Sequence, residues 1–252
     1  MTSDPCCHGG VEPEHIPGLS GLDVSGRPLC SCSKTGGADV VYRAALKGVE
    51  CWMRNHLGEA RALPMRRWMG GPASSAADRL ADERIADLCP RPMIMDLGCG
   101  PGRYTALLGN RGLTPLGVDT SAMAVALTRE RGGRAIQRDL FDRLPAEGRW
   151  DHILLADGNV GIGGDPVRVL QRAGELLTAG GSVIVELDGS QAAMVHEQIR
   201  WETKDYTGHW FPWSRVGPAS VGAIAATAAL RVVRLAMFTA RVVAVLESAT
   251  VC

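Results

Sequence analysis

The segment Asp96-Leu-Gly-Cys-Gly-Pro-Gly102 has a glycine at every second position after Leu97. The apolar run 92–95 before it is typical of a buried strand, and the apolar spacing in 104–108 after it is typical of a helix. Glycine adopts positive φ without a steric penalty, so its backbone can approach a ligand closely. A helix that begins at such a turn directs free N–H groups toward the same space. The segment therefore predicts a strand, a ligand-binding turn and a helix.

Acidic residues open this loop and follow the next two apolar runs. Asp96 precedes the glycines, and Asp119 and Asp139 end the runs that come later. Because the carboxyl ends of parallel strands meet at one edge of a sheet, we expect the three carboxylates to line one crevice. A carboxylate at the start of the loop suits a ligand with an ammonium or sulfonium group. The dinucleotide fingerprint requires a third glycine where Arg103 stands, which argues against a nicotinamide oxidoreductase.

With this loop and these acids, the segment from about Pro90 to Asp188 resembles the class I S-adenosylmethionine-dependent methyltransferases. The resemblance implies that the glycines hold the methionine and ribose, that Asp119 binds the ribose hydroxyls, and that Asp139 with the Leu140 backbone recognises the adenine. The expected cofactor residues are Asp96, Gly98, Cys99, Gly100, Gly102, Asp119, Thr120, Asp139, Leu140 and Asp157. Cys99 is interpreted as a small packing residue rather than a nucleophile.

Strand and helix patterns alternate after the loop. Strands are predicted at 114–119, 134–138, 150–156 and 182–187, and helices from 121 to the glycine pair 132–133 and over 166–177. Short connections predict a parallel sheet covered by helices. The last runs, 232–239 and 242–247, are too close for a helical crossover and predict a hairpin. The expected fold is α/β, a seven-stranded, mostly parallel, doubly wound sheet with one antiparallel edge strand.

Three regions are expected along the chain. Residues 1–37 are predicted to form a flexible arm rich in Cys, Gly and Pro, residues 38–90 an N-terminal helical cap, and residues 91–252 the methyltransferase domain. Helices are expected at 39–63 and about 75–88. The arm contains Cys6, Cys7, His8, Cys30 and Cys32. These could bind a thiophilic metal, but their spacing is not that of a structural zinc site, and we expect no metal.

The cap contains four residues that admit two interpretations. They are Trp52, Arg66, Arg67 and Trp68. Either they face a methyl acceptor, or the tryptophans belong to the core and the arginines are solvated. The second interpretation is favoured for any single residue because it is the more frequent arrangement.

Candidate catalytic residues lie in two later segments. The loop 157–165 is rich in glycine, and Asp157 is either a catalytic residue near the methyl group or a cofactor contact. The segment 189–218 is interpreted as a substrate lid that begins with a helix at 191–200. Its aromatic residues predict an apolar acceptor wall with His209 as general base. The alternative is a lid that packs its own aromatic residues and leaves His209 exposed.

Composition narrows the function further. The formal net charge is zero, which argues against general binding to nucleic acid or membranes. The N-terminus lacks a signal-peptide pattern, so a cytoplasmic location is expected. The loop 157–165 lacks the Asn/Asp-Pro-Pro-Tyr pattern of many nucleic-acid and protein methyltransferases. We therefore expect methyl transfer to a hydroxyl or amine of a small-molecule metabolite. An RNA or protein methyltransferase and a non-catalytic S-adenosylmethionine- or metal-binding partner protein are the alternatives.

Overall fold

The structure is a computed structural model that describes residues 36–249. Its larger sheet has seven strands in the order β11-β12-β7-β6-β3-β4-β5. They are β3 (Met93–Leu97), β4 (Thr114–Asp119), β5 (Ala135–Gln137), β6 (Trp150–Leu155), β7 (Leu177–Leu187), β11 (Leu230–Phe238) and β12 (Arg241–Ser248). Strands β3 to β7 are parallel, and β12 is antiparallel to both of its neighbours. The predicted sheet is confirmed, with its antiparallel strand one place in from the edge.

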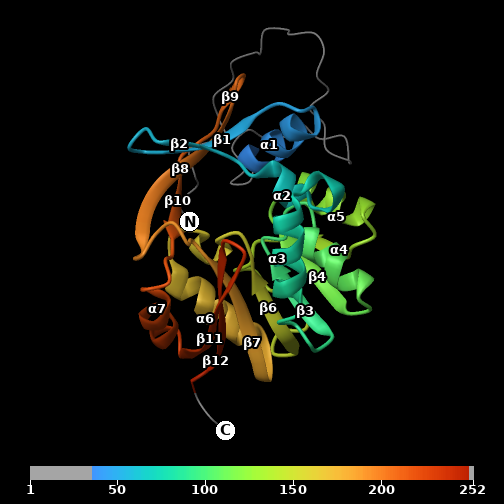
Figure 1. Cartoon of the computed structure of the whole chain (residues 1–252), viewed down its shortest axis with the longest axis vertical. Helices are drawn as coiled ribbons and strands as arrows, with labels where there is room; N and C mark the ends of the chain where they lie inside the picture. Colours follow the sequence, from blue (N-terminus) through green and yellow to red (C-terminus); the bar gives the residue numbers. More distant parts are fainter. Residues whose placement is uncertain (1–35, 250–252) are drawn as a thin grey trace, which may run out of the picture. The chain divides into compact units, whose positions relative to one another are not determined.

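Helices cover both faces of this sheet (Figure 1). They are α3 (Ala76–Ala86), α4 (Arg103–Asn110), α5 (Ala122–Glu130), α6 (Pro166–Leu176) and α7 (Val221–Thr227). Side chains alternate along a strand, so the buried neighbours Ile94 and Met95 enter different cores. Met95 packs in the core that contains residues of α6 and α7, and Ile94 packs in the core that contains residues of α3 and α4. Burial on both faces explains the continuous apolar runs of the central strands.

Three helices begin at polar capping residues. The side chains of Ser75, Ser121 and Asp165 accept hydrogen bonds from the backbone N–H three residues later at the starts of α3, α5 and α6. Such caps satisfy N–H groups that have no partner within the helix. Pro166 follows its cap as the first residue of α6, where proline lacks only an N–H that would be unpaired anyway.

A second, antiparallel sheet has the order β10-β8-β1-β2, with β9 paired to β8. Its strands are β1 (Cys51–Asn55), β2 (Ala60–Ala62), β8 (Val195–Thr203), β9 (Tyr206–Thr207) and β10 (Phe211–Arg215). Helix α1 (Gly36–Leu46) packs against β8 and α5. Helix α2 (Met65–Met69) and the short 3₁₀ turn η2 (Gly71–Ala73) lead into α3, and a second turn, η3 (Asn159–Gly161), follows β6. A bridge between Ile162 and Trp213 joins the loop after β6 to β10.

The helix predicted over 39–63 is wrong in part, and the helix predicted over 191–200 is wrong in full. Helix α1 ends at Leu46, Gly48 adopts a positive φ of 73°, and residues 51–62 form the β1–β2 hairpin. The segment 195–203 is β8, which pairs with β1 on one side and β10 on the other. Trp201 lies opposite Met53 and Glu202 opposite Trp52. Strand partners that are distant in sequence therefore override a local spacing that is compatible with a helix.

We predict that Gly161→Ala destabilises the junction between the two sheets. A Cβ at Gly161 would lie 1.8 Å from the backbone oxygen of Ser214 in β10, and this oxygen cannot move without moving the strand. We expect the free energy of unfolding in urea to fall by about 1–3 kcal/mol or more.

Gly222→Ala in α7 is the matched control, because a Cβ there has no atom within 4 Å. Alanine in a helix should stabilise by up to about 1 kcal/mol relative to glycine. Equal effects of the two substitutions would contradict the contact at Gly161.

Candidate functional site

The glycine loop lies directly after β3, at the carboxyl edge of the sheet. Gly98, Gly100 and Gly102 have φ values of 72°, 53° and 81°. A Cβ at Gly98 would lie 2.6 Å from Asn159 Nδ2, and one at Gly102 would lie 2.5 Å from Thr128 Oγ1. Both the backbone conformation and the close packing therefore require glycine, as the sequence predicts.

Two predicted acids meet at this loop. Asp119, at the end of β4, accepts hydrogen bonds from Gly100 N at 2.9 Å and from Ser121 N at 2.8 Å. Asp96 is buried beneath the loop and accepts from Thr105 Oγ1 at 2.9 Å. Burial raises the pKa of Asp96 to about 7, and the Thr105 hydrogen bond opposes this shift. The crevice expected at the ends of these strands thus contains one carboxylate on the loop and one below it.

The other predicted cofactor residues have less uniform positions. Asp157 follows β6. Cys99 is buried and its Sγ faces β4, because a Cβ at Gly117 of β4 would lie 2.7 Å from that Sγ. This position agrees with a packing role for Cys99. Asp139 is exposed and accepts from the Phe141 backbone N at 3.0 Å, and Leu140 is buried. The backbone oxygen of Thr120 accepts from Gln137 Nε2 at 3.1 Å.

Helix α1 contributes two residues that the sequence analysis missed. Asp39 accepts hydrogen bonds from Ser121 Oγ and, at 3.1 Å, from Met123 N, so it supports the first turn of α5. Tyr42 lies over the loop, since a Cβ at Gly100 would be 3.1 Å from its hydroxyl oxygen. Burial and the negative charge of Asp119 raise the pKa of Tyr42 well above its usual value, so the hydroxyl stays protonated as a donor. The sequence signal that could have indicated Tyr42 is that it is the one aromatic residue of α1.

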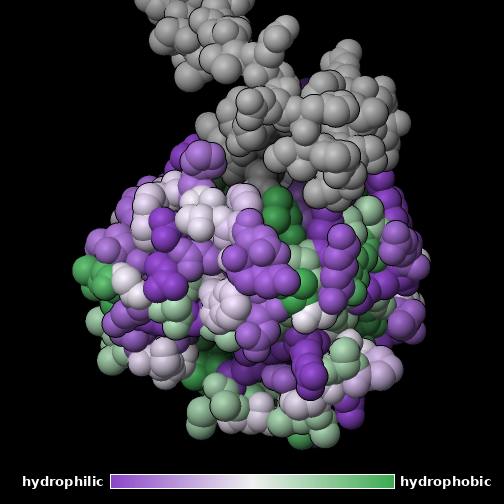
Figure 2. Space-filling view, turned by 90° about the horizontal axis from the view of Figure 1, so that it is seen from above, coloured by the Kyte–Doolittle hydropathy of each residue, from purple (hydrophilic) through white to green (hydrophobic). Residues whose placement is uncertain are grey.

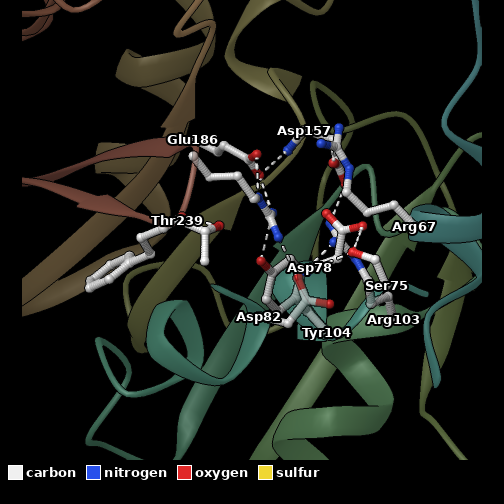
Figure 3. A network of polar contacts seen from close by, with 11 residues as sticks. Arg67, Ser75, Asp78, Asp82, Arg103, Tyr104, Asp157, Glu186 and Thr239 are labelled. Atoms are coloured by element: carbon white, nitrogen blue, oxygen red, sulfur yellow. Dashed lines mark hydrogen bonds and ion pairs between the residues drawn. The ribbon is translucent and has the colours of Figure 1, made fainter. Parts of the chain in front are cut away.

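A buried network of charges lies beside this crevice (Figure 3). Arg103, the first residue of α4, pairs with Asp82 of α3 at 2.7 Å and with Asp157. Arg241 of β12 donates to Asp82 at 2.5 Å and to Glu186 of β7 at 2.7 Å. Glu186 also accepts from the Asp157 backbone N at 2.8 Å. Each buried charge has an opposite partner, as burial requires. The network joins five elements at the carboxyl edge of the sheet.

Asp157 is held by this network in a conformation that few residues adopt. Its φ is 51°, and its Oδ1 lies 3.0 Å from Arg67 Nη2 of α2. Burial raises the pKa of Asp157, but the guanidinium groups of Arg103 and Arg67 outweigh this effect, so the pKa lies below its usual value. A carboxylate with a low pKa that is paired with two arginines is a poor proton acceptor. The geometry therefore favours a positioning role for Asp157.

Four aromatic side chains run from the glycine loop to the second sheet. The ring centroids of Tyr42 and Trp68 are 6.5 Å apart, those of Trp68 and Trp201 are 6.4 Å apart, and those of Trp201 and Phe211 are 5.4 Å apart. We call these four residues the aromatic row. His209 is exposed in the segment between β9 and β10. The structure thus connects the aromatic residues of 189–218 to the cofactor loop through two residues of the N-terminal region.

Two kinds of feature are absent from the described part of the chain, a cluster of metal-ligating side chains and a membrane-spanning helix. Residues 36–249 contain no group of three His, Cys, Asp or Glu side chains that could hold a metal ion. Cys6, Cys7, His8, Cys30 and Cys32 lie outside the described residues. Within the same range, no helix has the length and apolar character needed to cross a membrane. Hydrophilic residues predominate on the face shown in Figure 2, with hydrophobic ones between them.

Comparison with known proteins identifies relatives of this site. Residues 94–181 match a family model described as a methyltransferase domain. Trans-aconitate 2-methyltransferase from Paracidovorax citrulli is 30% identical over 111 residues, which are 42% of this chain. The match spans 43% of the length of that curated relative.

Solved structures share the fold at low sequence identity. A SAM-dependent methyltransferase from Bacteroides fragilis, in complex with S-adenosyl-L-homocysteine, has a TM-score of 0.67 and 18% identity, and the match covers 87% of this chain and 97% of that one. The 1,6-didemethyltoxoflavin-N1-methyltransferase from Burkholderia thailandensis has a TM-score of 0.53 and 18% identity, covering 69% and 78% of the two chains. The arrangement of strands and helices is therefore that of the class I methyltransferases.

We predict that Asp96 makes the ligand-free protein less stable as the pH rises toward neutrality. The folded state holds the Asp96 proton up to a pKa of about 7, whereas an unfolded Asp loses it near pH 3.9. The native state therefore binds more protons between these values, and the free energy of unfolding should fall by at most about 1.4 kcal/mol per pH unit. Urea unfolding at several pH values measures this slope.

Asp96→Asn should flatten the slope, because the amide does not titrate. Asp205→Asn is the control, since Asp205 is exposed and should leave the slope unchanged. If Asp96→Asn keeps the slope of the wild type, Asp96 ionises like a solvated carboxylate.

Proposed function

Because this chain contains a class I S-adenosylmethionine-dependent methyltransferase domain, we propose that it transfers a methyl group from S-adenosylmethionine to a hydroxyl or amine of a small molecule. The observation that carries the proposal is the glycine loop with Asp119 hydrogen-bonded to its centre, at Gly100 N. The homologous protein from P. citrulli is named as a small-molecule methyltransferase, and so is the B. thailandensis enzyme of the same fold. These names support methyl transfer as the reaction class. The methyl acceptor has to be identified by experiment.

The residues present fit S-adenosylmethionine. Glycine at 98 and 100 permits the positive φ of the loop, and Tyr42 packs against Gly100. Asp119 offers charged oxygens to hydroxyl donors such as those of a ribose. Asp96 and Asp119 supply negative charge near a cationic ligand, and a bound cation would favour the ionised form of Asp96.

The chemical task of the chain is mainly positioning. When bound, the cofactor supplies a methyl group on a sulfonium whose leaving group is already activated. The chain must then hold the acceptor in line with the bond between this methyl group and the sulfur. Such positioning can lower a large part of the activation barrier. The network of Arg103 and Asp157 fixes the loop after β6, and the aromatic row offers flat apolar surface for an acceptor.

An oxygen acceptor also requires removal of a proton. Asp157 is engaged with two arginines and is poorly suited to this role. His209 is exposed, and an imidazole is a common general base in proteins, so we retain His209 as the proposed base.

We predict that Asp119→Asn weakens S-adenosylmethionine binding by about 1–3 kcal/mol, because hydrogen bonds to a charged acceptor become bonds to a neutral one. The asparagine keeps one oxygen for Gly100 N or Ser121 N. Calorimetric titration measures the affinity, with NADH titrated in parallel.

Glu130→Gln, at the exposed end of α5, should bind like the wild type. NADH should give no heat of binding. Preferential binding of NADH would refute the proposed function, and an unchanged affinity of Asp119→Asn would remove Asp119 from the ribose site.

We also predict that His209→Ala lowers turnover by about 10²–10⁴-fold with an oxygen acceptor while leaving cofactor affinity unchanged. Methyl transfer from labelled S-adenosylmethionine to a panel of phenols and amines measures this effect. Turnover of the variant at the wild-type rate would exclude His209 as the base.

A further inference from the structure

Two neighbouring side chains of α2 carry buried donors that lack an acceptor. Trp68 Nε1 and Arg67 Nε are both inaccessible to solvent and have no hydrogen-bond partner in the described part of the chain. A buried donor left unpaired is destabilising, so such a group in a folded protein calls for an explanation. Their sequence neighbour Arg66 is exposed.

Both donors lie next to the proposed active site. The Trp68 ring lies between those of Tyr42 and Trp201 in the aromatic row, and Tyr42 lies over Gly100 of the cofactor loop. Arg67 reaches the loop after β6, where its Nη2 is 3.0 Å from Asp157 Oδ1. The unpaired donors are therefore close to both the cofactor loop and the proposed acceptor wall.

We propose that Arg67 and Trp68 form a carboxylate-binding site, in which Arg67 Nε and Trp68 Nε1 donate to the oxygens of a bound carboxylate. This inference rests on the proposed function. A carboxylate offers two oxygens that only accept, and guanidinium groups bind it in the most favourable geometry among cationic side chains. Asp157 Oδ2 is held by Arg103, and Asp157 Oδ1 lies 3.0 Å from Arg67 Nη2, but neither oxygen accepts a hydrogen bond from Arg67 Nε or Trp68 Nε1.

The charge of α2 itself is positive. The helix has the sequence Met-Arg-Arg-Trp-Met and contains no acid. Arg67 has Asp157 as its ion-pair partner and shares it with Arg103, whereas Arg103 also pairs with Asp82. A ligand carboxylate would give Arg67 a second acceptor and Trp68 its first.

This carboxylate has two possible sources, which share the same chemistry. It is either the amino-acid carboxylate of the methyl donor or an acid group on the acceptor. Because α2 lies between the glycine loop and the second sheet, its position is compatible with both sources of the carboxylate. The titrations below distinguish the two sources.

The test compares wild type, Arg67→Gln and Trp68→Phe by calorimetry. Trp68→Phe keeps an aromatic ring, removes the N–H and leaves the Arg67–Asp157 pair intact. Each protein is titrated with S-adenosylhomocysteine and with methylthioadenosine, which has the nucleoside and the sulfur but no carboxylate. Each is also titrated with benzoate and with neutral benzamide, with and without S-adenosylhomocysteine. Arg66→Gln is the control for a lost surface charge.

If the methyl donor supplies the carboxylate, both variants should bind S-adenosylhomocysteine about tenfold or more weakly and methylthioadenosine normally. If the acceptor supplies it, S-adenosylhomocysteine binding should be unchanged and benzoate binding lost, with benzamide unaffected. Arg66→Gln should resemble the wild type in every titration.

Unchanged affinities for all four probes in both folded variants would overturn the carboxylate site. A wild type that binds neither nucleoside would refute the proposed function instead, and the benzoate titrations would then decide the carboxylate site alone. If the wild type also fails to bind benzoate, both the proposed function and the carboxylate site are refuted.

Discussion

The pairing of Arg103 with Asp82 and Asp157 is the interaction on which the functional edge of this protein depends. Arg103 stands where a dinucleotide-binding fold has its third glycine, and its side chain turns back beneath the loop. A buried guanidinium is stable only with opposite charges around it. The same pairing therefore fixes α3 against α4 and holds the loop after β6 beside the glycines. A change that removed Arg103 would leave Asp82 with Arg241 and Asp157 with Arg67 as their remaining cationic partners.

Around this fixed edge, the parts that we propose to contact an acceptor come from outside the larger sheet. The aromatic row combines Tyr42 and Trp68 from the N-terminal region with Trp201 and Phe211 from the segment after β7. These side chains can differ between relatives while the sheet and glycine loop stay the same. Such a division explains why the fold is recognisable at 18% identity whereas the acceptor is not.

Local sequence was sufficient for the features that depend on neighbouring residues. The glycine loop and the alternation of strands and helices each follow from spacing within a few residues. The second sheet could not be predicted in this way, because Trp52 finds its partner 150 positions later at Glu202. The charge network was hidden for the same reason, since Asp82 has the sequence context of a solvated helix residue. Its burial becomes visible only when Arg241 of β12 is placed beside it.

The pairing of β1 with β8 also constrains the order in which the chain can fold. Strand β1 precedes the larger sheet in sequence and β8 follows most of it, so closing this pair requires a long loop to be closed. Contacts between distant segments form late, after more local ones have reduced the entropy cost. During synthesis, the segment 51–62 has no partner for its outer edge until residues 195–203 have left the ribosome. Strands β3 to β7 can thus pair before β8 reaches β1, whereas β11 and β12 leave the ribosome after β8 and complete the larger sheet later.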